Sequence, residues 1–498
     1  MFLPACSQRA CALLDRLPVK ALLPCWTLYA RRGWFTGDRA ETTLRLGKIW
    51  ALVTPVGVYV QIADPDAIHD VLARRLDFRR PTEPYKILEL FGPCISSADA
   101  ENWPRHRKVL AAPFNERIMG VVWSESVTQA QDMLRSWTSA DEISSCSKDT
   151  HTLSLNVLAV IGFNKSFKFR SWKREDNNKQ GIIKDEDNNI SYRDALQTIL
   201  DNTLFLLILR PKFLSYRFLP RSWRRIGEAA ATFKGYMTQL LAQEMAALKQ
   251  GTAGSGSLMT SFVRAGDAYQ KGFEKHIDRD TRTKGLSVDE IFGNMFVINF
   301  AGHDTTANTL AFAMLLLAAH PEIQEWLAEK VVGLTADTKP EQWEYNELFP
   351  KLVRLQALMV RNRTITIPPN VGVFSHVPAT HSHPEHYPEP LRFIPSRWIR
   401  LQSHTTETLE SLITPRKGAY LAWAEGPQVC PGMKFSRVEF VAVLACLIRG
   451  CRIEAVRLKG ESEEMMRKRV MQVVDDSELG LLLRMRNVER VRLRCVRV

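Results

Sequence analysis

The chain has 498 residues, of which 45% are hydrophobic and 24% are charged, and its formal net charge is +13. The hydrophobic content suffices for a large buried core, and the charged fraction is ordinary for a globular protein. The positive charge is spread along the chain without a basic stripe interleaved with aromatic residues, which argues against a nucleic-acid partner. It fits either a solvated basic surface or docking to an acidic electron-donor protein or an anionic membrane.

The nine cysteines are few for this length, odd in number and without a C-x-x-C pair. This usage argues against a disulfide framework and for a reducing compartment. Near the N-terminus, charged residues such as Arg9 and Lys20 interrupt every apolar run. No run reaches the roughly 20 apolar residues of a membrane span. Residues 1–40 are therefore interpreted as either an amphipathic segment at a membrane surface or the remnant of a truncated anchor.

The first predicted elements are a β-hairpin and a helix. Residues 44–63 are rich in β-branched and aromatic residues, and Gly57 lies at their centre, as in a hairpin. Asp64 or Asp66 then caps a helix that runs to about Leu76. Further on, the sequence predicts helices over most of 101–160, 192–210 and 223–249, a polar surface loop over 173–190 and a flexible link over 251–257.

A long central helix follows in the middle of the chain. Ser287 and Glu290 form an S-x-x-E capping box just before an apolar run, so the helix is predicted to begin there and to end at about His320. Around residues 296–300 it is apolar on all sides, which is typical of a helix at the centre of a large protein. With a further β segment at 363–375, the predicted fold class is mainly α with a small β portion.

Cys430 lies in a loop of unusual composition. Two glycines and two prolines flank it, which favours a tight loop whose backbone can approach a flat ligand closely. A helix is predicted from about Met433 to Arg449, and its positive N-terminal end favours a thiolate at Cys430. These residues leave two interpretations open, a buried cysteine in a turn or a thiolate ligand for iron.

This segment resembles the haem-binding signature of the cytochrome P450 family, F-x-x-G-x-R-x-C-x-G. The matching positions are Trp423, Gly426, Gln428, Cys430 and Gly432. The resemblance implies a haem whose iron is bound by the Cys430 thiolate and whose surroundings include the other four residues. Gln428 replaces the basic residue of the family pattern, so it keeps a hydrogen-bond donor for a haem propionate but brings no charge.

The central helix carries Ala-Gly-His-Asp-Thr-Thr at 301–306. On their own, these residues indicate a local kink with satisfied hydroxyls. The segment also resembles the oxygen-activation motif of the same family. That match implies that Ala301 and Gly302 leave room for oxygen and substrate, that Thr305 opens the helix and bonds the dioxygen, and that Asp304 belongs to a proton relay. His303 is interpreted as a helix-face residue.

Two further segments match the family. Trp103 and Arg107 resemble its W-x-x-x-R motif, and one helix face carrying both implies contact with a haem propionate. Without the resemblance, the same residues would be the start of a basic surface helix. Phe393 to Trp398 resembles the F-x-P-x-R-W segment and places Arg397 in the haem region. The order of the motifs from about residue 44 to residue 450 agrees with the family, and their style is most similar to fungal members.

One family motif is missing. The family has E-x-x-R on a helix before the second β region, but the helix expected from about Leu348 passes directly into a strand-like segment at 361–368. Without that Glu and Arg, we expect Arg397 to be a buried charge that lacks partners, at a cost of several kcal/mol. The four histidines of the following loop, His376, His381, His383 and His386, are not expected to bind a metal.

The resemblance implies a cytochrome P450-like fold, with one catalytic domain over 41–498 and the haem between the central helix and the cysteine loop. It implies a monooxygenase that inserts one oxygen atom from O2 into an apolar organic substrate, with electrons from NADPH through NADPH-cytochrome P450 reductase. Fungal secondary-metabolite biosynthesis and the cytosolic face of the endoplasmic reticulum membrane are the expected setting. Two alternatives stay open, a non-catalytic haem-binding relative, favoured by the missing E-x-x-R, and a helical interaction protein without a cofactor.

Overall fold

The computed structural model describes most of the chain. The described residues are 29, 34–54, 57–164, 166–171, 192–209, 211–214, 216, 218–251, 258–274, 285–357, 372–403, 408–479 and 482–498. The predicted loop over 173–190 lies outside them, as do residues 252–257 of the link predicted over 251–257. No helix within the described residues is long and apolar enough to cross a membrane.

The chain forms two compact units, and each is built from three separate stretches of sequence. The strand unit comprises residues 1–79, 352–433 and 459–490. The helical unit comprises residues 80–351, 434–458 and 491–498. A single catalytic domain over 41–498 stays a prediction.

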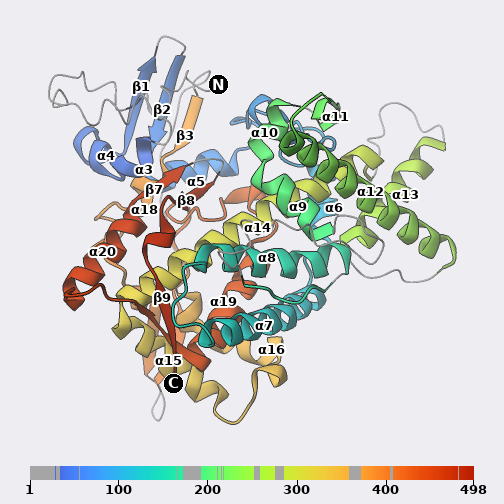
Figure 1. Ribbon diagram of the computed structural model, residues 1–498. Coiled ribbons are helices and arrows are strands. Elements are labelled where there is room, and N and C mark those ends of the chain that lie inside the picture. Colours follow the sequence, from blue (N-terminus) through green and yellow to red (C-terminus); the bar gives the residue numbers. More distant parts are fainter. Residues whose placement is uncertain are drawn as a thin grey trace. The chain divides into compact units, whose positions relative to one another are not determined.

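A three-stranded sheet opens the strand unit, in the order β1-β2-β3 (Figure 1). β1 (Ile49–Thr54) and β2 (Gly57–Ile62) are antiparallel, with Ile49 opposite Ile62, which confirms the predicted hairpin. β3 (Gly372–Ser375) joins β2 in parallel. Parallel neighbours need a long crossover, and here residues 80–351 of the helical unit lie between them in the sequence.

The helix α5 (Pro65–Ala73) follows β2 directly. The Asp64 carboxylate accepts the Ala67 N–H at 3.2 Å, as predicted for an N-cap, although the helix ends three residues before the predicted Leu76. Its apolar side packs with Ile62 and Leu421 into one buried cluster. This packing places α5 beside the segment that leads into the cysteine loop.

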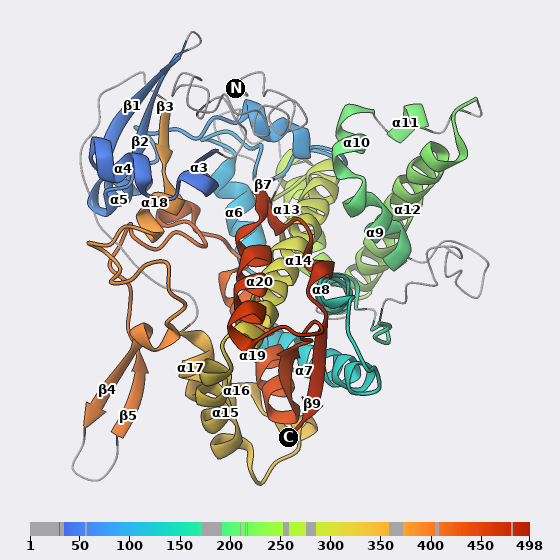
Figure 2. The same cartoon turned by 60° about the vertical axis from the view of Figure 1, so that its left-hand side comes forward.

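The remaining elements of the strand unit include two further hairpins. Figure 2 shows β4 and β5 as one of them. In chain order they are α3 (Trp34–Asp38), α4 (Glu41–Leu46), α17 (Val353–Gln356), α18 (Val377–His381), β4 (Ile399–Ser403), β5 (Thr408–Leu412), α20 (Glu463–Asp475), β7 (Ser477–Leu479) and β8 (Leu483–Met485).

The helical unit is an assembly of helices with one two-stranded sheet. Its helices are α6 (Trp103–Ala111), α7 (Glu116–Thr138), α8 (Cys146–Phe163), α9 (Tyr192–Asp201), α10 (Thr203–Ile208), α11 (Pro211–Leu214), α12 (Arg221–Lys249), α13 (Leu258–Glu274), α14 (Val288–Ala319), α15 (Pro321–Thr335), α16 (Tyr345–Leu348) and all but the first residue of α19 (Met433–Gly450). Its strands are β6 (Cys451–Ala455) and β9 (Leu493–Arg497), which are antiparallel.

The predicted long helix is α14. Its capping box is formed as predicted: the Ser287 hydroxyl accepts the Glu290 N–H at 3.3 Å, and the Glu290 carboxylate accepts the Ser287 N–H at 2.7 Å. α8 packs along α14 over much of its length (Figure 1). Most side chains of α14 are buried, as its apolar composition predicts.

The chain crosses the first turns of α14 at very short range. A Cβ atom added to Gly293 would lie 2.2 Å from the Gly92 carbonyl oxygen, and one added to Gly92 would lie 2.1 Å from the Asp289 carbonyl oxygen. Gly92 also has a φ of 140°, which other residues rarely adopt. Two glycines therefore permit a backbone contact that fixes the start of α14.

Two sequence expectations differ from the structure. Cys451 and Cys495 form a disulfide, although the cysteine usage argued against a disulfide framework, because the pairing of β6 with β9 brings the two together. The helix expected from about Leu348 is instead divided into α16, a 3-10 turn at 349–351 and α17. Pro350 lacks the N–H that a continuous helix would use.

Candidate functional site

The cysteine loop belongs to the strand unit and is held by its own backbone. The Cys430 N–H donates to the Trp423 carbonyl at 2.8 Å, and the Met433 N–H donates to the Cys430 carbonyl at 3.3 Å. These bonds close the loop over the 3-10 turn that includes Gln428 and end it where α19 begins. The Cys430 residue is exposed, which rules out the interpretation as a buried cysteine in a turn.

Contacts with α5 tether this loop. A Cβ atom added to Gly426 would lie 2.6 Å from the Leu72 carbonyl oxygen, and Gly426 has a φ of 73°. Glu425 accepts a hydrogen bond from the Gly418 N–H and pairs with the His69 ring of α5. Only glycine fits at 426, so this residue fixes the loop on α5.

Two histidines of the preceding loop accept hydrogen bonds from the backbone. His381 accepts the Leu421 N–H through Nε2 at 3.0 Å, and burial lowers its pKa to about 4, so the ring stays neutral. His376 caps α18 by accepting the Ala379 N–H at 3.1 Å. Among the described residues, no three side chains of His, Cys, Asp or Glu are grouped as metal ligands.

Arg397 is not a charge without partners, which corrects the expectation drawn from the missing E-x-x-R. Its guanidinium donates to four backbone carbonyls at 2.5–3.2 Å, those of Pro388, Glu389, Arg392 and Ile394. Burial lowers its pKa, and the negative charge of Glu389 opposes that shift. Because a guanidinium carries five donors, a loop rich in carbonyls can satisfy the charge without a second ion.

A hollow of about 160 Å³ opens beside Arg397. Its walls are formed by Tyr387, Pro390, Arg392, Phe393, Ile394, Pro395, Arg397 and Trp398. The truncated helix α17 belongs to the same unit, and its Arg354 pairs with Glu410 of β5 at 2.7 Å, with both side chains largely buried. The region around the missing motif is therefore held by other polar contacts.

In the helical unit, one stripe of residues along α14 is only partly buried. Ala301 and Thr305 are exposed, and Ile298, Asn308 and Phe312 are half-buried. Their spacing of three or four residues places them on one face. This stripe is the side of α14 that can face a bound group.

Ala301 and Gly302, the two small residues of the motif, have different surroundings. Ala301 is exposed, whereas a Cβ atom added to Gly302 would lie 3.1 Å from a methyl carbon of Leu158 on α8. The space that Gly302 leaves is thus occupied by Leu158 and serves helix packing. The Thr305 hydroxyl donates to the Ala301 carbonyl at 2.7 Å, and the helix stays continuous from residue 288 to 319.

Asp304 lies among charged and polar neighbours. Its Oδ1 is 2.9 Å from Nδ1 of His303 and 3.6 Å from Nε2 of His151 on α8. The charges of His303 and Asp304 also act on the carboxyl of Asp201 in α9. His151 and Asp201 belong to no recognised motif, so the sequence alone could not identify them as neighbours of Asp304.

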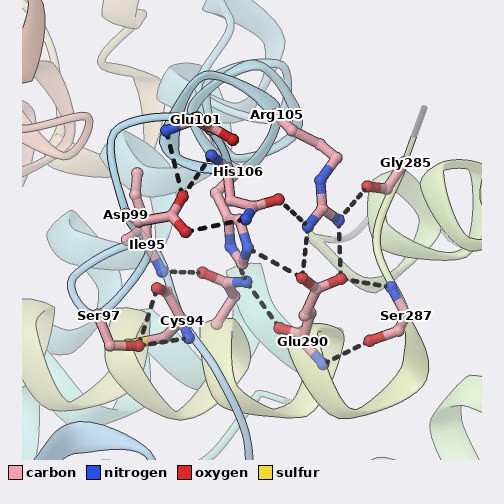
Figure 3. A network of polar contacts seen from close by, with 12 residues as sticks. Cys94, Ile95, Ser97, Asp99, Glu101, Arg105, His106, Gly285, Ser287 and Glu290 are labelled. Atoms are coloured by element: carbon pink, nitrogen blue, oxygen red, sulfur yellow. Dashed lines mark hydrogen bonds and ion pairs between the residues drawn. The ribbon is translucent and has the colours of Figure 1, made fainter. Parts of the chain in front are cut away.

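α6 begins at Trp103 and contains Arg107, as the motif predicts. Trp103 is buried, and Arg107 is half-buried. Between them, Arg105 binds the Glu290 carboxylate at 2.6 and 2.8 Å, and His106 lies 3.2 Å from the same carboxylate (Figure 3). This network ties the start of α6 to the first turn of α14.

The Glu290 carboxylate should make the free energy of unfolding depend on pH. Burial alone would raise its pKa, but hydrogen bonds from His106, Arg105 and the Ser287 N–H outweigh burial, and the pKa lies well below the usual 4.5. The unfolded chain therefore binds the proton first as pH falls. The stabilisation is complete above about pH 4.5 and is lost below it as the pH falls through the folded pKa.

Replacing Glu290 with Gln is expected to destabilise the protein by about 3 kcal/mol at pH 7, because Arg105 then keeps a largely buried charge without its counterion. The midpoint of urea unfolding, followed by circular dichroism at pH 7 and at pH 4, measures the loss. Glu83→Gln is the control, since the Glu83–Lys86 pair is exposed and should leave the midpoint unchanged. A midpoint for Glu290→Gln as high as that of the control at pH 7 would contradict the assigned role.

The structure thus groups the predicted site residues by unit. Arg397 and the cysteine-loop residues Trp423, Gly426, Gln428, Cys430 and Gly432 lie in the strand unit. Trp103, Arg107, Ala301, Gly302, Asp304 and Thr305 lie in the helical unit.

These residues suit a haem. Cys430 presents an exposed sulfur, and a Cβ atom added to Gly432 would lie 3.8 Å from that sulfur, so the glycine keeps the space beside it open. The thiol is followed at once by α19, an 18-residue helix whose N-terminus favours a thiolate. A soft thiolate is an established ligand of haem iron.

Comparison with known proteins agrees with this chemistry. The sequence model of the family described as Cytochrome P450 matches residues 38–353 and 352–479. A cytochrome P450 monooxygenase of Arthrobotrys oligospora is 28% identical, with 95% of this chain and 88% of that protein covered. The phomenoic acid biosynthesis cluster cytochrome P450 monooxygenase of Leptosphaeria maculans is also 28% identical, with 86% and 77% covered.

The fold has solved counterparts. The crystal structure of the cytochrome P450DA heme domain superposes with a TM-score of 0.63 at 16% identity, covering 96% of this chain and 95% of that one. The predicted fold class, mainly α with a small β portion, is therefore confirmed. The family implies a haem-thiolate cofactor, an organic substrate, O2 and a redox partner. By sequence and by fold, the chain belongs to the cytochrome P450 family and is an oxidoreductase of the monooxygenase type.

Proposed function

We propose that this chain holds a haem through the Cys430 thiolate and inserts one oxygen atom from O2 into an apolar organic substrate. The observation that carries the proposal is the cysteine loop, in which an exposed thiol lies between a glycine fixed on α5 and the start of α19. When bound, the haem supplies oxygen activation, which the electron-rich thiolate promotes.

The other strand-unit residues would hold and orient the group. Gly426 and Gly432 let the backbone approach a flat ring system, and Trp423 packs an aromatic ring beside it. Gln428 and Arg397 offer donors to propionates, as do Trp103 and Arg107 in the helical unit. Arg397 already donates to four backbone carbonyls, those of Pro388, Glu389, Arg392 and Ile394.

The helical-unit residues would serve the substrate and the protons. Ala301 leaves open space on the stripe of α14, and the half-buried Ile298 and Phe312 give that stripe an apolar character suited to an apolar substrate. Thr305 presents a hydroxyl there, and Asp304 beside it holds a proton near the reacting atoms. Exclusion of bulk water by the apolar side chains keeps those protons from leaking.

The setting of the reaction is proposed from the relatives and the charge. Electrons would come from NADPH through a separate reductase, and a net charge of +13 favours docking to an acidic partner. The phomenoic acid cluster relative supports a role in fungal secondary metabolism. Attachment to the cytosolic face of the endoplasmic reticulum membrane, by residues 1–40, follows the family.

A second candidate is a haem-binding relative without catalysis. No E-x-x-R lies between Leu348 and Pro368, and the family match divides into two parts that meet at residues 352–353. Both observations favour a chain that has lost a piece of the family fold at this point.

One spectrum and one assay test the two candidates. The purified chain is reduced, exposed to carbon monoxide and scanned for the far-red Soret band of thiolate-ligated haem. That band, followed by NADPH consumption with a reductase, supports the monooxygenase. The band without NADPH consumption supports the non-catalytic relative, and absence of any haem signal overturns both. The transcript across residues 355–365 would then be sequenced.

A further inference from the structure

Two imidazole rings meet one oxygen of Asp304. Oδ1 of Asp304 lies 2.9 Å from Nδ1 of His303 and 3.6 Å from Nε2 of His151. The two rings come from α14 and α8 and are arranged edge to face, with their centroids 5.1 Å apart. All three side chains belong to the helical unit.

The remaining nitrogen of each ring is engaged by a backbone carbonyl. Nδ1 of His151 is 2.6 Å from the Ser147 carbonyl oxygen, and Nε2 of His303 is 3.1 Å from the His151 carbonyl oxygen. Carbonyl oxygens only accept, so each of these nitrogens carries its hydrogen in every protonation state. The nitrogen of His151 that faces Asp304 is therefore Nε2, whereas Nδ1 of His303 lies 2.9 Å from Oδ1 of Asp304 without forming a hydrogen bond to it.

This arrangement requires a proton. A carboxylate oxygen and a bare imidazole nitrogen both present lone pairs, so their approach is favourable only when a hydrogen lies on one of them. One proton, on Asp304 or on Nε2 of His151, makes this approach favourable. The other charged groups nearby are Lys148 on α8 and Asp201 on α9, because the charges of Lys148 and Asp304 both act on the Asp201 carboxyl.

The three groups differ in their access to water. The side chain of His303 is 1% exposed, whereas those of His151 and Asp304 are 22% and 30% exposed. The His303 side chain is thus closed off from solvent. His151, on α8, is in contact with solvent.

We infer that Asp304 and His151 share one proton, and that His151 takes protons from water and passes them to Asp304. In the transfer, the Nε2–H bond of the His151 imidazolium breaks and an O–H bond forms on Asp304. The two charges disappear together, and His151 then regains a proton from water. This inference rests on the proposed role of Asp304 as a proton donor, and His151 acts through Asp304.

The shared proton is tested by histidine NMR on the full chain labelled with 13C at Cε1. His151→Gln and His303→Gln assign the two signals, and the pH titration of His151 is compared between the wild type and Asp304→Asn. Removal of the carboxylate is expected to lower the His151 midpoint by about one pH unit, because an opposite charge within 4–6 Å shifts a pKa by roughly that much or more. An unchanged midpoint in folded Asp304→Asn overturns the inference.

The transfer is tested by the pH profile of NADPH consumption with a reductase. His151→Gln is expected to slow consumption about tenfold and to flatten its dependence between about pH 6 and 8, since glutamine cannot titrate. The control is His320→Gln, another histidine beside a carboxylate, that of Glu322 at 3.0 Å, at the end of α14. A His151→Gln profile like that of the control overturns the transfer.

The proposed haem-thiolate function and the shared proton can be disproved independently of each other. If the wild type lacks the far-red carbon monoxide band but the His151 midpoint is lower in Asp304→Asn, the proposed function is wrong and the shared proton stands. A normal band with an unshifted midpoint removes the shared proton and leaves the haem-thiolate function. Circular dichroism of each variant confirms that the helices remain formed.

Discussion

Cys430→Ser is expected to abolish the far-red carbon monoxide band completely while leaving the fold intact. Serine keeps the shape of the side chain but offers a hydroxyl, which is a harder and far less acidic ligand than a thiol. The Cys430 residue is exposed, and the hydrogen bonds of the loop use its backbone, so the substitution removes no packing. The difference spectrum and the midpoint of thermal unfolding measure the two effects separately.

Cys446→Ser is the matched control, because both cysteines lie at the same helix. Cys446 is buried within α19, and burial raises the pKa of its thiol to about 12, so it is protonated and unavailable to a metal. Its replacement should leave the band in place and cost about 1–3 kcal/mol by burying a hydroxyl. A band that survives in Cys430→Ser would show that another residue binds the iron.

Gly293→Ala is expected to lower stability by about 3 kcal/mol or more, the largest effect of any single methyl group that we predict. The new Cβ atom would meet the carbonyl oxygens of Gly92 and Pro93 at 2.2 and 2.4 Å. Both are backbone atoms, so relief requires the crossing segment to move away from α14. The urea midpoint should fall, and the Glu290 network on the same turn should loosen with it.

Gly235→Ala separates this clash from the general effect of alanine in a helix. Gly235 lies in α12, and a Cβ atom added there would meet nothing within 4 Å. This variant should gain about 0.5–1 kcal/mol from helix propensity. If Gly293→Ala were equally stabilising, the close crossing of α14 would be wrong.

Local patterns in the sequence predicted the local structure correctly. The Ser287–Glu290 capping box, the Asp64 cap and the hairpin around Gly57 each depend on residues within a few positions of one another. The Cys430 loop belongs with them, because its glycines, its prolines and the following helix lie within one short segment. Such features depend on residues that are close together in the chain, so the local sequence is enough to predict them.

Contacts between distant segments could not be predicted. His69 and Glu425 meet although more than 350 residues separate them, and neither belongs to a motif. The Cys451–Cys495 disulfide follows from strand pairing, which spacing alone does not reveal. The partners of Arg397 were missed for another reason: the expectation considered ionic partners, whereas the loop satisfies the guanidinium with backbone carbonyls.

The division of each unit into three stretches of sequence has a consequence for biosynthesis. β2 leaves the ribosome more than 300 residues before β3, its parallel partner. At about 5–20 residues per second, this interval lasts roughly 15 to 60 s. During that time one edge of β2 offers unpaired N–H and C=O groups to any other nascent chain. β9, at residues 493–497, must also emerge before β6 is paired. We therefore expect this chain to need chaperone protection during translation, and its yield on expression to respond to slower synthesis at lower temperature.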